Sequence, residues 1–390
     1  MSLFNCFNAR VEAVAYKLRF KNKILPLIIV VLNVLIGFPV FLYRLLFAST
    51  VRDSDPARIL IIRADRIGDM ILSLPVYREL KELFPNAHIT CMASTLSSQL
   101  IEGNPYVDSI MVYDPPWFDN MKGKNFLHNY LHILRSIRKQ KFDTAIDLRG
   151  NIFNFFFLMV LPGIRQRVSI DAALGTFLLT HAVPYKKGRH ETDSFLDIIK
   201  SLGGRKISNP YAEIFFSEED EAYAKTFFQI SNFTEKDTVI VLHPGAGNGR
   251  IYKLWPEKYF YELGKKLVEQ YGAKIIITGS NDEIDLAQRI KNQIGEHAFL
   301  AAGEITRLKN LAAVLKKCCL CIGTSTGITH LAAAAGIPVI VLCGPEDPQR
   351  WCPLGDNHIL INKEVACRPC REKSCQYDGR CLKLITPQDV

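Results

Sequence analysis

The sequence predicts an α/β protein with two Rossmann-like, doubly wound domains, and three observations support this fold class. First, short apolar runs rich in β-branched residues alternate with helical stretches from residue 58 onward. Second, these runs are continuously apolar, which is typical of parallel strands buried on both faces. Third, the alternation begins again after about residue 236 with the same order of strand, Gly-containing loop and helix. The length of 390 residues also fits two domains.

The domains are expected at residues 58–225 and 226–390, after an N-terminal segment and linker at residues 1–57. Ligands of such sheets bind beyond the carboxyl ends of the strands, so two domains facing a cleft would bind two ligands. The expected strands are RILIIR (58–63), HITCMA (88–93), SIMVYD (109–114), DTAIDL (143–148), RVSID (167–171), TVIVLH (238–243), KIIITG (274–279), LCIG (320–323), PVIVLC (338–343) and HILIN (358–362).

The N-terminal segment contains a long uncharged stretch, residues 24–43. As a helix it would be about 30 Å long, enough to cross the core of a bilayer. It could span a membrane, lie in the membrane interface, or form a buried core helix. Pro26, Asn33, Gly37 and Pro39 interrupt the stretch, which favours a kinked or re-entrant segment over a straight span.

The same part of the chain is basic. Residues 1–58 contain eight Lys and Arg against three Asp and Glu, so they contribute +5 of the formal net charge of +9. An anionic membrane surface is therefore the expected partner. Nucleic acid is not expected, because the body of the chain has no basic stripe with interleaved aromatic residues.

The eleven Cys fit a reducing compartment rather than a secreted disulfide scaffold. Several lie in or beside apolar strands and are interpreted as small buried side chains: Cys91, Cys318, Cys319, Cys321 and Cys343. Four more form a tail with the spacing C-x2-C-x4-C-x5-C: Cys367, Cys370, Cys375 and Cys381. Four thiolates could bind a structural zinc ion, but the second pair is more widely spaced than usual, so free thiols stay the alternative.

Charged residues gather where the first strand passes into a helix, in IIRADRIGDMILSLP. Asp69 falls in the first helical turn, where the helix dipole stabilises negative charge. Gly68 lets the chain pass close to a ligand, and Arg63 and Arg66 suit a phosphorylated ligand. Asp69 is therefore a candidate for contact with a bound ligand. The alternative is that Asp69 only complements the helix dipole or caps the helix. Asp65, four residues earlier, is the other acid that could take the functional role of Asp69.

A second strand-to-loop junction is LHPGAGNGRIYKLWP. Gly245, Gly247 and Gly249 can bring backbone N–H groups close to a phosphate, and Lys253 adds a cation. The spacing is not the dinucleotide fingerprint, because it reads G-x-G-x-G and no helix begins at the third Gly. An ordinary Gly-rich surface loop is the alternative.

The next loop, TGSNDEID, places Asp282 and Glu283 after a strand, where an acid often binds ribose hydroxyls. The alternative is that both are first-turn acids favoured by the helix dipole.

The segment CIGTSTGITHLAAAAG predicts a strand that ends in small residues at a helix N-terminus. Thr324, Ser325, Thr326 and Gly327 would form an anion site there. His330 lies one turn into the helix and faces the same end, so it is a candidate for contact with the bound anion. The alternative is that His330 is a structural histidine.

Three motifs together, ILIIRADRIGDMILSLP, LHPGAG followed by KLWP, and GTSTGITHLAAAAGIPVIVLCGPEDPQRW, resemble the bacterial heptosyltransferases of lipopolysaccharide core synthesis, glycosyltransferase family nine. The resemblance covers residues 58–390. It implies a GT-B fold with an acceptor-binding N-terminal domain and a nucleotide-sugar-binding C-terminal domain. It also implies an inverting transfer that needs no metal cofactor, typically from ADP-heptose.

By motif, the resemblance implies that Asp69 is the catalytic base and that Lys253 steadies the donor phosphates. Gly327 and His330 match the donor-pocket loop. Ser325 stands where the family often has Asp, so the donor sugar or nucleotide could differ. The candidate donor-binding residues are Gly245, Ala246, Gly247, Glu283, Thr324, Ser325, Thr326, Gly327 and His330. The candidate acceptor-binding residues are Arg63, Arg66 and Gly68.

The expected protein is thus a glycosyltransferase at the cytoplasmic face of the bacterial inner membrane, attached through residues 1–47, with a glycolipid acceptor. The resemblance implies that catalysis needs no metal, and the D-x-D triplet at residues 53–55 does not contradict this, because it lies in the linker. Two alternatives stay open: a nucleotide-sugar epimerase of the same fold, and a non-catalytic membrane scaffold. A nicotinamide oxidoreductase is disfavoured by the missing G-x-G-x-x-G.

Overall fold

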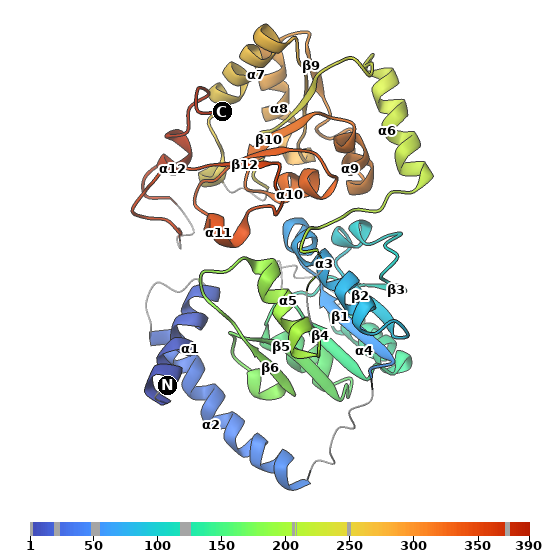
Figure 1. Cartoon of the computed structure of the whole chain (residues 1–390), viewed down its shortest axis with the longest axis vertical. Helices are drawn as coiled ribbons and strands as arrows, with labels where there is room; N and C mark the ends of the chain where they lie inside the picture. Colours follow the sequence, from blue (N-terminus) through green and yellow to red (C-terminus); the bar gives the residue numbers. More distant parts are fainter. Residues whose placement is uncertain are drawn as a thin grey trace. The chain divides into compact units, whose positions relative to one another are not determined.

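Figure 1 shows the computed structural model, which describes residues 3–18, 24–47, 55–117, 126–204, 207, 209–247, 251–370 and 375–390. The chain divides into two compact units. The first comprises Met1–Asp65 and Ser73–Pro210, and the second comprises Arg66–Leu72 and Tyr211–Val390. This division differs from the expected boundaries, because the N-terminal helices belong to the first unit and residues 211–225 belong to the second.

A six-stranded parallel sheet forms the centre of the first unit, in the order β3-β2-β1-β4-β5-β6. Leu60 of the central strand β1 lies opposite Thr90 of β2 and Ala145 of β4. The strands are β1 (Arg58–Arg63), β2 (His88–Ala93), β3 (Ser109–Val112), β4 (Thr144–Asp147), β5 (Gln166–Asp171) and β6 (His181–Pro184). The helices that follow them are α3 (Ile67–Leu83), η1 (Ser97–Leu100), α4 (Phe126–Gln140), η2 (Asn154–Val160), η3 (Thr176–Leu178) and α5 (Glu191–Ser201).

The second unit repeats this topology, with a parallel sheet in the order β12-β11-β10-β7-β8-β9. Its central strands are β7 and β10, where the strand order reverses. The strands are β7 (Val239–His243), β8 (Lys274–Ile277), β9 (Ala298–Leu300), β10 (Leu320–Thr324), β11 (Val339–Leu342) and β12 (His358–Ile361). The helices are α6 (Glu218–Ile230), η4 (Ile251–Lys253), α7 (Glu257–Tyr271), η5 (Asn281–Glu283), α8 (Ile284–Ile294), α9 (Leu308–Lys316), α10 (Gly327–Ala334), α11 (Pro348–Trp351) and α12 (Arg380–Lys383).

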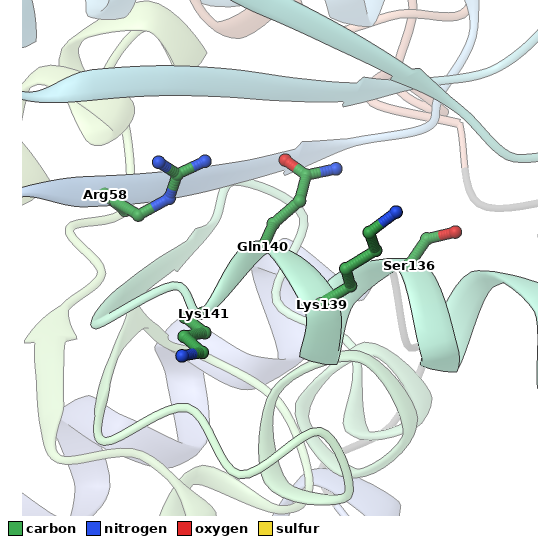
Figure 2. A pocket seen from close by; sticks show the side chains of 5 residues that line it. All are labelled: Arg58, Ser136, Lys139, Gln140 and Lys141. Carbon is green, nitrogen blue, oxygen red and sulfur yellow. The ribbon is translucent and has the colours of Figure 1, made fainter.

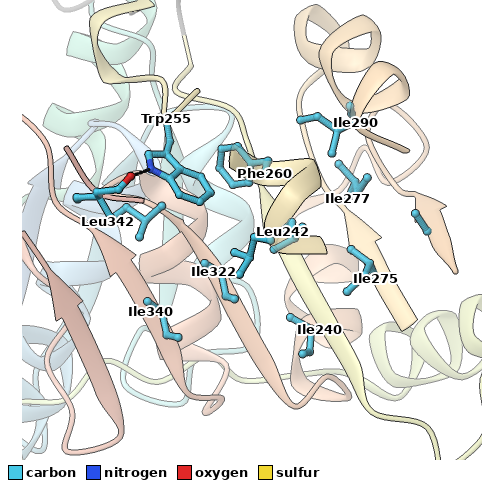
Figure 3. Packing of buried hydrophobic residues seen from close by; sticks show 14 of the residues in the cluster. Ile240, Leu242, Trp255, Phe260, Ile275, Ile277, Ile290, Ile322, Ile340 and Leu342 are labelled. Atoms are coloured by element: carbon cyan, nitrogen blue, oxygen red, sulfur yellow. Dashed lines mark hydrogen bonds between the residues drawn. The ribbon is translucent and has the colours of Figure 1, made fainter. Parts of the chain in front are cut away.

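The core of the second unit fixes the loop that carries Lys253 (Figure 3). Trp255 is 2% exposed and packs edge-on against Phe260, with the ring centroids 4.8 Å apart. The indole Nε1 of Trp255 donates a 2.7 Å hydrogen bond to the carbonyl of Ile385, which ties the C-terminal segment to the same core. A buried aromatic ring two residues after Lys253 therefore holds the end of its loop in place.

All ten expected strands are present, and two further strands, β6 and β9, complete the sheets. Both lie at the edge of a sheet, and both are short and only partly buried. An edge strand has a neighbour on one side only, so its sequence does not need the continuous apolar run that marks a central strand.

The expected N-terminal apolar helix is present as α2 (Ile24–Phe47), and it packs beside α1 (Leu3–Lys17) and against η3 of the first unit. Among the residues that the structure describes, no helix combines the length and the apolar character needed to cross a membrane. Attachment of this segment to a membrane stays a prediction.

Candidate active site

At the carboxyl end of β1, Asp65 is held between two arginines. Arg63 Nη1 donates to Asp65 Oδ2 at 3.0 Å and to the carbonyl of Leu148 at 3.1 Å, and Arg149 forms an ion pair with the other carboxylate oxygen. Arg63 and Asp65 are only 3% and 5% exposed. The guanidinium of Arg63 is therefore engaged in a buried network, and its expected contact with the acceptor stays a prediction.

Asp147, at the end of β4, is a second buried acid beside this network. It accepts hydrogen bonds from the N–H of Gly150 at 2.7 Å and from Asn154 Nδ2 at 2.8 Å. Asn154 in turn accepts a 2.9 Å hydrogen bond from Trp117 Nε1. Burial raises the pKa of Asp147, and these hydrogen bonds oppose the rise. Asp147 and Arg149 were not expected, although Asp147 ends the central strand β4 and Arg149 lies two residues beyond it.

The first turn of α3 contains Asp69 and belongs to the second unit. A Cβ atom placed on Gly68 would lie 3.2 Å from His330 Cδ2, and one placed on Gly327 would lie 2.9 Å from Ile67 Cβ. Glycine at both positions permits this close packing. The segment with Asp69, which is half-buried, thus lies against the start of α10 within the second unit. Arg66 is exposed, and its contact with the acceptor stays a prediction.

At the N-terminus of α10, Thr326 is the N-cap residue, and its backbone N–H donates a 3.3 Å hydrogen bond to Thr329 Oγ1. Thr324 is buried and donates a 3.4 Å hydrogen bond to the carbonyl of Gly245, which links the two expected donor loops. Ser325 is half-buried and His330 is 5% exposed. A helix of this length directs N–H groups and a partial positive charge toward an anion, so the arrangement can hold a diphosphate.

The Gly-rich loop after β7 is bonded to Glu283. Glu283 Oε1 accepts from the N–H groups of Ala246 and Gly247, both at 3.0 Å, and Oε2 accepts from Ser280. A Cβ on Gly245 would lie within 2.4 Å of the Glu283 carboxylate, so a larger residue at this position would have to displace that carboxylate. Burial alone would raise the pKa of Glu283, but hydrogen bonds from Ser280 and Gly247 and nearby His243 together lower it.

This arrangement bears on two expectations for the donor site. The amides of Ala246 and Gly247, expected to contact phosphate, donate to Glu283 instead, and Glu283, expected near the ribose, has its acceptor oxygens in use. Both donor roles stay predictions. Gly249 lies outside the residues that the structure describes.

Lys253 ends η4 and forms a buried ion pair with Glu346, which follows β11. The two residues are 8% and 9% exposed. The carboxylate beside the ammonium group fixes the position of the Lys253 side chain, and its expected contact with the donor phosphates stays a prediction. Glu346 was not expected, although it lies in the quoted motif GPEDPQRW beyond the carboxyl end of a parallel strand.

The Cys-rich tail surrounds a cavity of about 20 Å³ lined by all four cysteines. Among the described residues, which omit 371–374, no group of three His, Cys, Asp or Glu side chains could hold a metal ion. Zinc at this position stays a prediction. Of the cysteines expected in the core, Cys91, Cys318, Cys321 and Cys343 are buried, whereas Cys319 is exposed.

A second cavity, of about 630 Å³, lies in the first unit at the start of β1 (Figure 2). Arg58, Ser136, Lys139, Gln140 and Lys141 line it. It adjoins the amino end of β1, the opposite end of the strand from Asp65. Lys139 lies in the last turn of α4 and Lys141 follows it, where both complement the helix dipole. The cavity is therefore not part of the candidate site.

Comparison with known proteins identifies the family of this chain. Residues 130–380 match the family described as glycosyltransferase family 9 (heptosyltransferase). Lipopolysaccharide heptosyltransferase 3 of Escherichia coli is 25% identical over 302 residues, covering 75% of this chain and 84% of that protein. Lipooligosaccharide heptosyltransferase 2 of Haemophilus influenzae is 27% identical over 313 residues, covering 78% and 88%.

Solved structures share the two-unit fold. The family 9 glycosyltransferase of Veillonella parvula aligns with a TM-score of 0.75 at 24% identity, covering 85% of this chain and 94% of that one. The ADP-heptose lipopolysaccharide heptosyltransferase II of E. coli aligns with a TM-score of 0.67 at 21% identity, covering 85% and 96%. The predicted GT-B type architecture with two Rossmann-like units is confirmed. Because the family match covers most of the chain, this protein belongs to glycosyltransferase family 9 and is a glycosyltransferase.

Proposed function

We propose that this enzyme transfers a heptose from ADP-heptose to a lipopolysaccharide core or a related glycolipid acceptor, with inversion at the anomeric carbon and without a catalytic metal. The names of its relatives support the sugar and the pathway. The observation that carries the proposal is the packing of the turn with Asp69 against the N-terminal turn of α10 in the second unit. This packing supports a single site that combines the Asp69 carboxylate with the N-terminus of α10.

In the proposed step, an acceptor hydroxyl attacks the anomeric carbon as the bond to the diphosphate oxygen breaks. Asp69 accepts the hydroxyl proton, which becomes acidic only as the new bond forms. The N–H groups at the start of α10 and the ammonium group of Lys253 stabilise the charge that grows on the leaving ADP. The transition state is oxocarbenium-like, as in glycoside hydrolysis.

The donor and acceptor are assigned to different parts of the chain. Residues around Gly327 and His330 are proposed to bind the nucleotide sugar, and Arg66 and Gly68 the acceptor. Ser325, in place of the carboxylate common in the family, is proposed to adjust recognition of the donor. The enzyme is proposed to act at the cytoplasmic face of the inner membrane, where the N-terminal segment would keep it close to a lipid-linked acceptor.

A donor screen followed by product analysis tests this function. The purified protein is melted with ADP-heptose and with ADP-, UDP-, GDP- and dTDP-hexoses. A bound donor at a hundredfold excess over Kd should stabilise the protein by about 2.7 kcal/mol. Mass spectrometry of a heptose-deficient lipopolysaccharide acceptor should then show addition of one heptose.

The outcomes separate the alternatives. Conversion of the donor without an acceptor would indicate an epimerase, and absence of stabilisation by every nucleotide sugar would indicate a scaffold. Stronger stabilisation by a donor other than ADP-heptose would replace the proposed donor and point to Ser325 as its cause.

A further inference from the structure

The helix α2 is fastened to the first unit along one face. Near its middle, Asn33 Nδ2 donates to the carbonyl of Ala173 at 2.8 Å, and Asn33 Oδ1 accepts from the N–H of Gly175 at 2.9 Å. One turn further on, a Cβ added to Gly37 would lie 3.1 Å from Phe177 Cβ. Both hydrogen-bonding groups of the amide side chain are thus used to hold the helix against the η3 region.

The helix α1 strengthens this attachment. Val11 and Val14 of α1 pack with Ile29 and Val30 of α2 in a small buried cluster that Leu174 completes. Arg10 Nε donates to Asp171 at 2.9 Å, and a buried ion pair joins Lys17 to Glu191. The two helices therefore form a hairpin that is built into the first unit rather than a loosely attached leader.

The rest of the surface of α2 between Ile24 and Phe38, here called its outer face, is apolar and exposed. Each of its side chains is at least 36% exposed: Ile24, Leu25, Leu27, Ile28, Val31, Leu32, Val34, Leu35, Ile36 and Phe38. The most exposed of them, Ile24, Leu35 and Phe38, are 65%, 64% and 62% exposed. A contiguous apolar surface of this kind is unusual on a water-soluble surface and marks an interaction site.

Basic residues lie around this hairpin. Lys186 is exposed, and the exposed Lys187 lies over the ring of Tyr16 in α1, with Nζ 6.0 Å from the ring centroid. The stretch between the two helices also contains Arg19, Lys21 and Lys23 in the sequence, outside the described residues. Apolar side chains flanked by cations complement an anionic lipid surface better than they complement another protein.

We propose that α2 lies in the plane of an anionic membrane, with its outer face in one leaflet, and does not cross the bilayer. This inference rests on the proposed membrane association and specifies its geometry. Asn33 lies about 14 Å along the helix from Ile24, which is near the midplane of a spanned bilayer core of about 30 Å. A spanning helix would draw the backbone around Ala173 and Gly175 into the hydrocarbon, where irregular backbone exposed to lipid is not tolerated.

A vesicle assay with the full-length protein, without any donor sugar, tests the lipid contact. The wild type should sediment with phosphatidylglycerol-containing vesicles and less with phosphatidylcholine vesicles. The double variant Ile28→Asp, Leu35→Asp should lower partitioning about tenfold or more, because two apolar contacts become charged. Ile230→Asp, at a 77% exposed apolar position on α6, is the matched control and should leave partitioning unchanged. Melting temperatures confirm that the variants are folded.

Equal partitioning of the double variant and the wild type would overturn the proposal. So would a lipid-free dimer, seen by analytical ultracentrifugation, that the double variant converts to monomer without a change in vesicle binding. Because neither measurement uses a sugar, failure here is distinct from failure of the proposed transfer reaction.

Topology is tested with an epitope tag at the N-terminus and protease added outside preformed vesicles. An in-plane helix leaves the tag on the same side as both units, so the tag should be removed together with them. Protection of the tag while the second unit is digested would show that α2 spans the bilayer, and the in-plane geometry would be wrong.

Discussion

The first unit and the second unit use the same strand order, with β1 beside β4 in one and β7 beside β10 in the other. The residues at these two strand ends differ in kind. In the first unit, charged side chains pair with one another, as Asp65 does with Arg63 and Arg149. In the second, small residues and the start of α10 leave backbone N–H groups as the binding elements. One topology therefore supports a rigid charged frame in one unit and, in the other, a helix N-terminus that we propose as an anion site.

The comparison also separates two acids that are four residues apart. Asp65 is buried and paired within the first unit, whereas Asp69 is half-buried and belongs to the second unit. Asp65 has the surroundings of a structural group. Asp69 is more accessible, and we propose that it meets the substrate. The predictions below test this division of roles, from the largest expected effect to the smallest.

Asp69→Asn should have the largest effect on catalysis. The amide keeps the shape of the side chain but cannot accept a proton. Loss of a general base should lower turnover by about 10²- to 10⁴-fold, or roughly 3 to 5 kcal/mol of barrier. Single-turnover transfer from saturating donor measures this, and donor affinity should change little. Asp285→Asn, at an exposed position on α8, is the control. Transfer by Asp69→Asn at close to the wild-type rate would assign the base elsewhere.

Asp65→Ala should act on stability. It leaves the Arg63 guanidinium buried without its carboxylate, and breaking a buried pair in this way costs about 3 to 5 kcal/mol of unfolding free energy. Chemical denaturation measures the loss. Asp193→Ala removes an acid that is 42% exposed and 3.9 Å from Arg189, and it should change stability by less than about 1 kcal/mol. Asp65→Asn should reduce turnover less than Asp69→Asn does, and the reverse order would exchange their roles.

Lys253→Ala should reduce turnover by about 10²- to 10³-fold while weakening donor binding less, because the charge on the diphosphate grows toward the transition state. The variant also leaves Glu346 beside an empty position. Lys253→Ala combined with Glu346→Gln removes that buried charge and should recover stability without recovering turnover. Lys258→Ala, at a side chain that is 67% exposed, is the control. An unchanged rate in Lys253→Ala would remove this lysine from the site.

The Cys-rich tail is a feature of the second unit that the first unit lacks. If its four thiolates bind zinc, protein purified without chelators should contain about one zinc ion per chain. Elemental analysis gives the answer directly, and Cys367→Ser should abolish the metal content. Metal-free protein that melts like metal-supplemented protein would leave the four cysteines as packed thiols.

The sequence predicts the parts of this molecule that depend on local patterns. Continuous apolar runs predicted the buried strands. The edge strands β6 and β9 were not predicted, because a half-exposed strand does not need such a run. The ion pair of Lys253 with Glu346 joins residues 93 positions apart, and that of Asp65 with Arg149 joins residues 84 apart. Pairings at that separation depend on how the strands are ordered, and no spacing rule in the sequence reveals them.

The same limit explains the Gly-rich loop after β7. Its glycines were expected to make room for a phosphate. In the structure, Gly245 makes room for the side chain of Glu283, which crosses the loop from another strand end. A glycine in a loop shows that something approaches closely, but the sequence does not show whether it is a ligand or a neighbouring side chain.

Glu283→Gln should have the smallest effect, and its pH dependence identifies the cause. The carboxylate accepts hydrogen bonds from Ala246, Gly247 and Ser280, and its pKa lies below the ordinary value of 4.5. A lowered pKa in the folded state stabilises the protein at pH above 4.5, and this stabilisation is lost as the pH falls through the lowered value. The amide should therefore reduce stability by about 1 kcal/mol at neutral pH.

The difference in melting temperature between wild type and Glu283→Gln should shrink as the pH falls below 4.5, since the protonated acid and the amide then resemble each other. Gly245→Ala should disturb the same contact by placing a Cβ against the carboxylate, and it should lower stability at every pH because its effect is steric. A constant difference for Glu283→Gln from acid to neutral pH would mean that the charge of Glu283 does not hold the loop. The hydrogen bonds from the Ala246 and Gly247 amides to Glu283 would then not depend on its charge. A donor phosphate could replace the carboxylate as the acceptor of these hydrogen bonds.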